Sequence, residues 1–209
     1  MVIEKRQHSS KRGKLAANSY REKKRDQILS ASARLFWRKG YLGTSMEDVA
    51  RATNLNKASI YYYFPSKADI LYGVAVTAGT ELLAKAQHLF GNDLPPEEKL
   101  RLLIADHLRW HTSYPRFADI ERKESRCLPP KLLKSYIGVR DQYEAIYRNV
   151  ISQGIDRGIF RPISPKIASL FTLGLVNSIL RWFKPKGELS PSEIANLAFE
   201  YVCNALRNH

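Results

Sequence analysis

The sequence predicts an all-α protein, with a small N-terminal domain of three short helices followed by a larger helical domain. Apolar residues recur at spacings of three and four through most of the chain, as on one face of a helix. Ser, Thr, Asn and Asp precede these segments as helix caps, and Gly or Pro follows them. We find no credible alternation of apolar and polar residues, which a half-buried strand requires, and no internal repeat.

The 209 residues carry a formal net charge of +14, and the excess is concentrated near the N-terminus. Residues 1–67 contain 15 Lys and Arg against 5 Asp and Glu. A basic segment beside a nearly balanced body indicates a polyanion-binding domain on a separate scaffold. The two cysteines suggest a reducing compartment, and neither a signal peptide nor a membrane span is evident. We therefore expect a cytoplasmic protein without membrane partners.

Residues 1–18 are polar and basic, and we expect them to form a flexible arm, either a solvated tail or a contact to DNA phosphates. The first helix is expected to begin at Ser19, which can form a capping box with Glu22. It should end at Gly40, which can adopt the left-handed conformation of a helix C-terminus.

Two short helices follow in the predicted N-terminal domain, residues 19–66. Thr44 or Ser45 can cap the second helix. Asn56 can cap a third helix that starts at Lys57, and Pro65 cannot continue it. Further helices are expected over residues 67–209, the larger C-terminal domain; they begin at Ser66–Asp69, Pro95–Pro96, Arg116, Pro130, Ser164 and Ser190.

The last two predicted helices, at about 165–183 and 191–207, are apolar around most of their circumference. Such helices need cover on several sides. Small residues along them would allow close helix contacts, as in a four-helix bundle across a twofold axis. We expect a homodimer through these helices; the alternative is a helix pair in the core of a monomer.

The run KASIYYYF at residues 57–64 has the features of a DNA-recognition helix. A short turn separates it from the preceding helix, as in a helix-turn-helix motif whose second helix enters the major groove. Ile60 and Phe64 share the face that packs on the first two helices, so the tyrosines at 61–63 fan out and at least one must be exposed. Lys57 and Ala58 are placed to touch base edges, and Ser59 and Lys67 to hold phosphates.

Residues 28–71, ILSASARLFWRKGYLGTSMEDVARATNLNKASIYYYFPSKADIL, resemble the DNA-binding domain of TetR-family transcriptional regulators. The matching positions are Ala33, Phe36, Gly40, Thr44, Ala50, Leu55, Ile60, Tyr61, Phe64, Lys67 and Leu71. The resemblance implies a homodimeric helical repressor of a palindromic double-stranded DNA operator, with a small-molecule effector site in the C-terminal domain. By position it assigns base contacts to Lys57, Ala58 and Tyr61, and DNA-backbone contacts to Thr44, Ser59, Tyr62, Tyr63 and Lys67.

The C-terminal part, from Glu121 onward, is similar to a branch of TetR-like repressors that control fatty-acid or sterol-ring catabolism. The stretches at Arg140–Glu144, Gly158–Pro162 and Trp182–Gly187 carry this similarity. It implies an acyl-CoA thioester as effector, which would need an apolar tunnel with cations at its mouth. The ligand-binding candidates are Arg109, Trp110, Tyr114, Phe117, Arg122, Arg140, Tyr143, Phe171, Arg181 and Trp182; for each, core packing or surface solvation is the alternative.

Four other interpretations of the sequence remain open. His107 and His111 have the spacing of a two-histidine metal site, but without a third ligand we expect pocket lining or surface and no metal or cofactor. No catalytic motif is present, so we expect no enzyme, and an enzyme acting on acyl-CoA is an alternative. A regulator of efflux or stress genes that senses a hydrophobic molecule, or a DNA-packing protein, would also fit.

Overall fold

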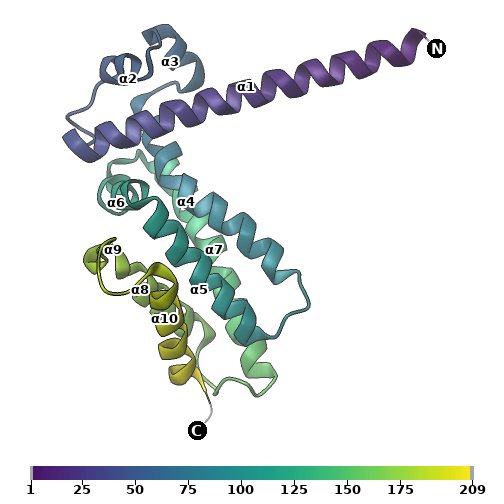
Figure 1. The fold of residues 1–209 in the computed structure, drawn as a ribbon, viewed down its shortest axis with the longest axis vertical. Helices are drawn as coiled ribbons and strands as arrows, with labels where there is room; N and C mark the ends of the chain where they lie inside the picture. The colour runs from purple at the N-terminus through teal and green to yellow at the C-terminus, as the bar shows by residue number, and fades with distance from the viewer. Residues whose placement is uncertain (1, 208–209) are drawn as a thin grey trace. The chain divides into compact units, whose positions relative to one another are not determined.

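The computed structural model describes the backbone of residues 2–207, and the side chains of residues 18–207 apart from Ala78. This part of the chain is helical, with one isolated bridge between Phe160 and Arg207 and no other strand pairing, so the all-α prediction is confirmed (Figure 1). The elements are α1 Val2–Lys39, α2 Met46–Thr53, α3 Lys57–Tyr63, α4 Lys67–Phe90, α5 Pro96–Ser113, α6 Pro115–Glu124, η1 Ser125–Cys127, α7 Pro130–Asp156, α8 Pro165–Asn177, α9 Ile179–Trp182 and α10 Pro191–Leu206.

The chain divides into two compact units, Met1–Val74 and Ala75–His209, and α4 continues from the first into the second. The division falls inside α4 rather than at its start, where we expected the domain boundary. In the N-terminal unit, α1 packs against α2, and α2 packs against α3. The buried side chains that join these helices include Ile28, Phe36, Val49 and Ile60.

The predicted start of the first helix is wrong, whereas its predicted end is confirmed. Helix α1 begins at Val2 and runs through Ser19 without a break, because Lys, Arg, Gln and Ala are good helix formers and no proline interrupts them. The DNA contact suggested for residues 1–18 falls almost wholly outside the described side chains. At the other end, Gly40 has φ of 73° and its N–H donates to the Phe36 carbonyl at 2.9 Å.

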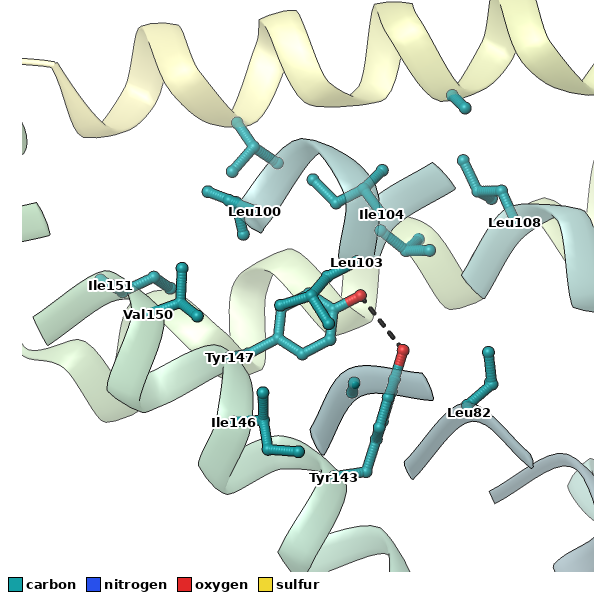
Figure 2. Close-up of a cluster of buried hydrophobic side chains, with 14 of the residues drawn as sticks. Leu82, Leu100, Leu103, Ile104, Leu108, Tyr143, Ile146, Tyr147, Val150 and Ile151 are labelled. Atoms are coloured by element: carbon teal, nitrogen blue, oxygen red, sulfur yellow. Dashed lines mark hydrogen bonds between the residues drawn. The ribbon is translucent and has the colours of Figure 1, made fainter. Parts of the chain in front are cut away.

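The core of the C-terminal unit lies where α5 packs against α7 and α10, and where α7 packs against α8. Figure 2 shows leucines of α5 and Ile104 in one buried cluster with Tyr143, Ile146, Tyr147 and Val150 of α7. Packing is close at Gly154, where an added Cβ atom would overlap the ring of Phe160.

The helix predicted at about 165–183 is divided in the structure. Helix α8 ends at Asn177, and the N–H of Ser178 donates to the carbonyls of both Gly174 and Leu175. The N–H of Arg181 then donates to the Ser178 carbonyl at 3.0 Å, a bond to the third residue back that tightens the backbone. The short helix α9 follows. The last helix begins with a capping box between Ser190 and Glu193.

Candidate nucleic-acid interface and internal cavity

Local side-chain hydrogen bonds fix where α2 and α3 begin. Ser45 caps α2, and its capping box with Asp48 is complete: the Asp48 N–H donates to Ser45 Oγ and the Ser45 N–H donates to Asp48 Oδ2. These hydrogen bonds from Ser45 and one from Lys39 lower the pKa of Asp48 to about 2. Asn56 caps α3 by accepting from the Ser59 N–H at 2.7 Å. The turn between the helices passes through Asn54, with φ of 54°.

Helix α3 has one buried face and one exposed face. Ile60, and Phe64 directly after the helix, are buried against the unit. Tyr61 and Tyr62 are 45% and 69% exposed, and Tyr63 is half-buried. The rest of the exposed face consists of Lys57 and Ala58 at the start of the helix, with Ser59 half-buried beside them.

Cations of α1 hold the end of α3. Arg25 donates from Nη1 to the Tyr63 carbonyl at 2.7 Å, and its guanidinium carbon lies 4.3 Å from the Phe64 ring centroid. Arg21 lies over the Tyr62 ring at 5.6 Å. The tyrosine rings therefore have neighbours within their own unit while the side chains of Tyr61 and Tyr62 remain largely exposed.

Thr44 and Lys67, both predicted to contact the DNA backbone, make hydrogen bonds within the protein. Thr44 is 2% exposed, and its hydroxyl donates to the Gly40 carbonyl at 2.9 Å, so it does not lie on the exposed face of α3. Lys67 Nζ donates to the carbonyls of Tyr41 at 2.8 Å and Thr44 at 2.7 Å. Lys67 therefore ties α4 to the loop before α2, and one of its three N–H groups remains for another acceptor.

The exposed face of α3 has the chemistry of a groove-binding surface. Lys57 forms an ion pair with Glu47 at 3.2 Å, and both side chains are at least half exposed. Such a pair contributes little to stability, so Lys57 can exchange Glu47 for another partner at small cost. Tyrosine hydroxyls can donate to phosphate oxygens, and a short helix with small residues at its start fits a major groove.

The C-terminal unit encloses a cavity of about 1010 Å³. Its size lies at the upper end for small-molecule sites. Helices α4 to α9 and η1 line it with Ala75, Val76, Gly79, Leu82, His107, His111, Glu121, Arg122, Ser125, Tyr136, Ile137, Val139, Arg140, Asp141, Tyr143, Glu144, Arg148, Lys166, Leu170, Leu173, Gly174, Asn177 and Leu180. The inner wall, around Leu82, His107, His111 and Tyr143, is buried, whereas much of the α7 and α8 side is exposed.

Of the ten predicted ligand-binding residues, three line this cavity: Arg122, Arg140 and Tyr143. Trp110 is buried, but its indole N–H donates to Glu81 at 2.7 Å, away from the cavity lining. Phe117 packs against the hydrophobic core. The other five lie on exposed positions: Arg109, Tyr114, Phe171, Arg181 and Trp182.

A connected group of polar side chains lies on the cavity wall, and we call His107, His111, Tyr143 and Asn177 the histidine cluster. His107 Nε2 lies 3.1 Å from Asn177 Oδ1, which can only accept, so Nε2 carries the proton. His107 Nδ1 therefore accepts from the Tyr143 hydroxyl, 3.2 Å away. Tyr143 in turn accepts from the Tyr147 hydroxyl at 3.3 Å, the bond drawn in Figure 2.

His111 stacks on His107 with ring centroids 4.4 Å apart. Burial lowers the pKa of His111 to about 4, and burial together with the neighbouring imidazole lowers the pKa of His107 to about 3. Both rings are therefore neutral near pH 7. His111 Nδ1 is buried without a hydrogen-bond partner within the described residues.

Charged residues also line the cavity. The cations are Arg122, Arg140, Arg148 and Lys166, and the carboxylates are Glu121, Asp141 and Glu144. Arg122 pairs with Asp119 at 2.7 Å and Arg148 lies 3.9 Å from Glu144. Tyr136 donates to Glu121, and burial together with that carboxylate raises the pKa of Tyr136.

The sequence interpretation missed most of the polar lining as ligand-binding residues, including Glu144, Arg148, Lys166 and Asn177. The histidines were singled out, and their pocket-lining alternative is confirmed. The one-turn spacing of Tyr143 and Tyr147 on α7 was a usable signal for a buried polar pair, whereas Asn177 had none, because its partner His107 lies on another helix.

No helix in residues 2–207 is both long and apolar enough to cross a lipid bilayer. Among the same described residues, no group of three or more His, Cys, Asp or Glu side chains is arranged to hold a metal ion.

Comparisons with known proteins agree with this architecture. Residues 93–206 match the tetracyclin repressor-like C-terminal domain, and residues 28–73 match the bacterial regulatory proteins of the tetR family. The repressor KstR2 of Mycobacterium tuberculosis is 24% identical over 173 residues, covering 82% of this chain and 86% of KstR2.

Two crystal structures are also similar. The TetR-family regulator PfmR from Thermus thermophilus is 30% identical with a TM-score of 0.78, covering 87% of this chain and 99% of PfmR. AibR, in complex with isovaleryl coenzyme A and operator DNA, is 25% identical with a TM-score of 0.76, covering 85% of this chain and 97% of AibR. Because the family models cover both the helix-turn-helix and more than half of the chain, this protein belongs to the TetR family of transcriptional regulators, which bind operator DNA and act as dimers.

Proposed function

We propose that this TetR-type repressor leaves a palindromic operator when an acyl-CoA thioester from fatty-acid or sterol degradation binds its cavity in the cytoplasm. The observation that carries the proposal is the cavity itself, which combines a buried inner wall with exposed cations. An acyl-CoA is an amphiphile with an apolar acyl group and an anionic nucleotide end, so it needs both surfaces.

On the DNA side, the proposed contacts come from the exposed face of α3. Lys57, Ala58 and Tyr61 face the bases, and Tyr62 and Tyr63 hold the backbone together with Ser59. Lys67 can add a phosphate contact with its remaining N–H, whereas the Thr44 side chain is already bonded to Gly40.

Relatives support the choice of effector. AibR is a structural neighbour crystallised with isovaleryl coenzyme A and operator DNA, and the ketosteroid transcriptional regulator KstR2 is another neighbour. The cations Arg122, Arg140 and Lys166 are the proposed partners of the CoA phosphates, and the buried inner wall receives the acyl group.

The proposed dimer interface is the outer surface of α8 and α10, which pack against each other. Phe171 is 73% exposed and Tyr201 is 69% exposed, and Ile167 and Leu197 are also exposed large apolar residues on these helices. A second copy would cover this apolar surface. Substitution of Phe171 by Glu should therefore shift the protein from dimer to monomer in multi-angle light scattering; an unchanged dimer would place the interface elsewhere.

The ligand acts in this proposal by a shift of population. It favours a dimer whose two recognition helices no longer lie one DNA turn apart, about 34 Å. It can do so only if it binds that dimer more tightly than the dimer that fits the operator.

One observation favours a second candidate. Three carboxylates line the cavity with the four cations, which leaves less net positive charge than a CoA nucleotide calls for. A hydrophobic effector without CoA, as for a regulator of efflux or stress genes, would suit that balance.

The test is fluorescence anisotropy on DNA from just upstream of the protein's own gene, with competitor DNA and a panel of acyl-CoA thioesters. The proposal expects tight, sequence-selective binding and release by a thioester, but not by the free acid or by CoA alone. Release only by uncharged hydrophobic compounds would favour the second candidate. Equal binding to competitor DNA would instead indicate a DNA-packing protein.

A further inference from the structure

The histidine cluster has hydrogen-bonding capacity that the protein itself leaves unused. Its hydrogen bonds run in one direction: Tyr147 donates to Tyr143, and Tyr143 donates to His107. His107 then donates to Asn177 Oδ1. Neither ring nitrogen of His111 makes a hydrogen bond within the described residues, although the side chain is only 4% exposed. A buried polar atom without a partner costs free energy, and native proteins rarely retain one without a reason.

The position of His111 gives such a reason. Its ring is on the cavity lining and is held by stacking on His107 and by an edge contact with Trp110 at 5.6 Å between centroids. Asn177, on the facing helix α8, also lines the cavity, and its amide N–H₂ makes no hydrogen bond within the described residues. Because Nδ1 is buried, a ligand in the cavity would meet Nε2 of one neutral imidazole, which either donates or accepts, and one amide donor.

We propose that the effector carries an uncharged hydroxyl or carbonyl oxygen on its otherwise apolar part, and that His111 binds this oxygen. The inference rests on the proposed function, because it specifies which group of the acyl portion the cavity wall binds. His111 is then a specificity-determining residue, and Asn177 adds a second donor to the same oxygen.

An uncharged oxygen fits this wall better than a carboxylate does. Both imidazoles are neutral near pH 7, so neither supplies a positive charge. No lining cation hydrogen-bonds to the histidine cluster within the described residues: Arg122, Arg140 and Lys166 are exposed, and Arg148 lies beside Glu144. A carboxylate buried without a cation would lose its hydration without compensation.

An unsubstituted acyl chain is also disfavoured. It would place methylene groups against His111 and the Asn177 amide and leave both unpaired. A site built to hydrogen-bond an oxygen discriminates strongly against the analogue that lacks it.

The experiment is calorimetric titration of the full-length protein with ω-hydroxyacyl-CoA thioesters of increasing chain length, each paired with its unsubstituted parent. At the best-fitting length, the hydroxylated thioester should bind about tenfold more tightly than its parent. His111→Phe should abolish that preference and retain the affinity for the parent. His88→Phe, at an exposed histidine of α4, is the matched control and should keep the preference.

A second variant covers the possibility that His111→Phe disturbs the core, which circular dichroism would reveal. Asn177→Ala changes an exposed residue and should reduce the same preference. Equal binding of each pair by the unsubstituted protein overturns the inference and leaves the acyl-CoA proposal intact. If no thioester of either series binds, both fall.

Discussion

The two units of this protein present the side chains of their proposed binding sites in opposite ways. Helix α3 holds its tyrosines on the outside, where Tyr62 is 69% exposed, while Ile60, Phe64 and Arg25 secure the helix from behind. The histidine cluster is assembled from three helices, and its Tyr143 is 7% exposed. On α3, therefore, the residues proposed to bind DNA differ from those that hold the fold, whereas in the cavity the side chains proposed to bind the effector also hold the fold.

The largest expected effect concerns the packing that supports the cavity. Gly154→Ala would place a methyl group against the buried Phe160 ring, and should lower the free energy of unfolding by about 3 kcal/mol. Gly138 lies on the same helix, and a Cβ atom added there would meet nothing within 4 Å, so Gly138→Ala should be neutral or stabilise by up to about 1 kcal/mol. Urea unfolding followed by circular dichroism measures both, and equal effects would show that Phe160 can move aside.

The neutral histidines predict a pH dependence that belongs to the C-terminal unit. Their pKa values are about 3 and about 4 in the folded protein, against 6.5 when unfolded, so the unfolded state binds more protons as the pH falls. The free energy of unfolding should therefore drop by about 3 kcal/mol between pH 6.5 and about pH 5. Urea unfolding across this range, with His111→Phe as the comparison, should show a shallower slope for the variant; identical slopes would mean that His111 is already accessible to protons.

A tyrosine-to-phenylalanine substitution in each unit distinguishes the buried histidine cluster from the exposed face of α3. Tyr143→Phe leaves His107 Nδ1 without its donor, and should cost about 1–3 kcal/mol of stability. Tyr62→Phe should change stability by less than about 0.5 kcal/mol and weaken DNA binding about tenfold. Unfolding curves and anisotropy on both variants decide this, and unchanged DNA affinity in Tyr62→Phe would remove the phosphate contact.

In the N-terminal unit, we expect Lys67 both to hold the fold and to contact DNA. Lys67→Met removes the bonds to two backbone carbonyls, and should lower stability by about 1–2 kcal/mol. If its third N–H reaches a phosphate, the slope of log affinity against log salt should fall by about one unit. Lost stability with an unaltered slope would make Lys67 a purely structural residue. Lys57→Met is the control for stability alone, because its ion-pair partner is the exposed Glu47.

Local chemistry explains what could be predicted from the sequence. The caps Ser45 and Asn56 each accept a hydrogen bond from the residue three positions further on, and Gly40 has a positive φ. Each of these features depends on local sequence and could therefore be predicted. The buried face of α3 followed in the same way from helical spacing. The break before α9 could not be read, because a tightened turn at Ser178 has no distinctive residue pattern.

Long-range contacts explain what was missed. Lys67 bonds to the carbonyl of Tyr41 and Trp110 donates to Glu81, and neither partner is close in sequence. Periodicity places an aromatic residue on a helix face, but only packing decides whether that face meets a cavity, the core or solvent. Phe171 was assigned to the ligand site for this reason, and lies 73% exposed outside it.

The most direct test of separate sites is to measure two affinities for each of two variants: DNA binding without ligand, and thioester binding without DNA. Tyr62→Phe should weaken only DNA binding, and His111→Phe should weaken only binding of the ω-hydroxyacyl-CoA. If Tyr62→Phe lowered the thioester affinity, or if His111→Phe lowered the DNA affinity as much as Tyr62→Phe does, the division between an outward DNA site and an inward effector site would be wrong.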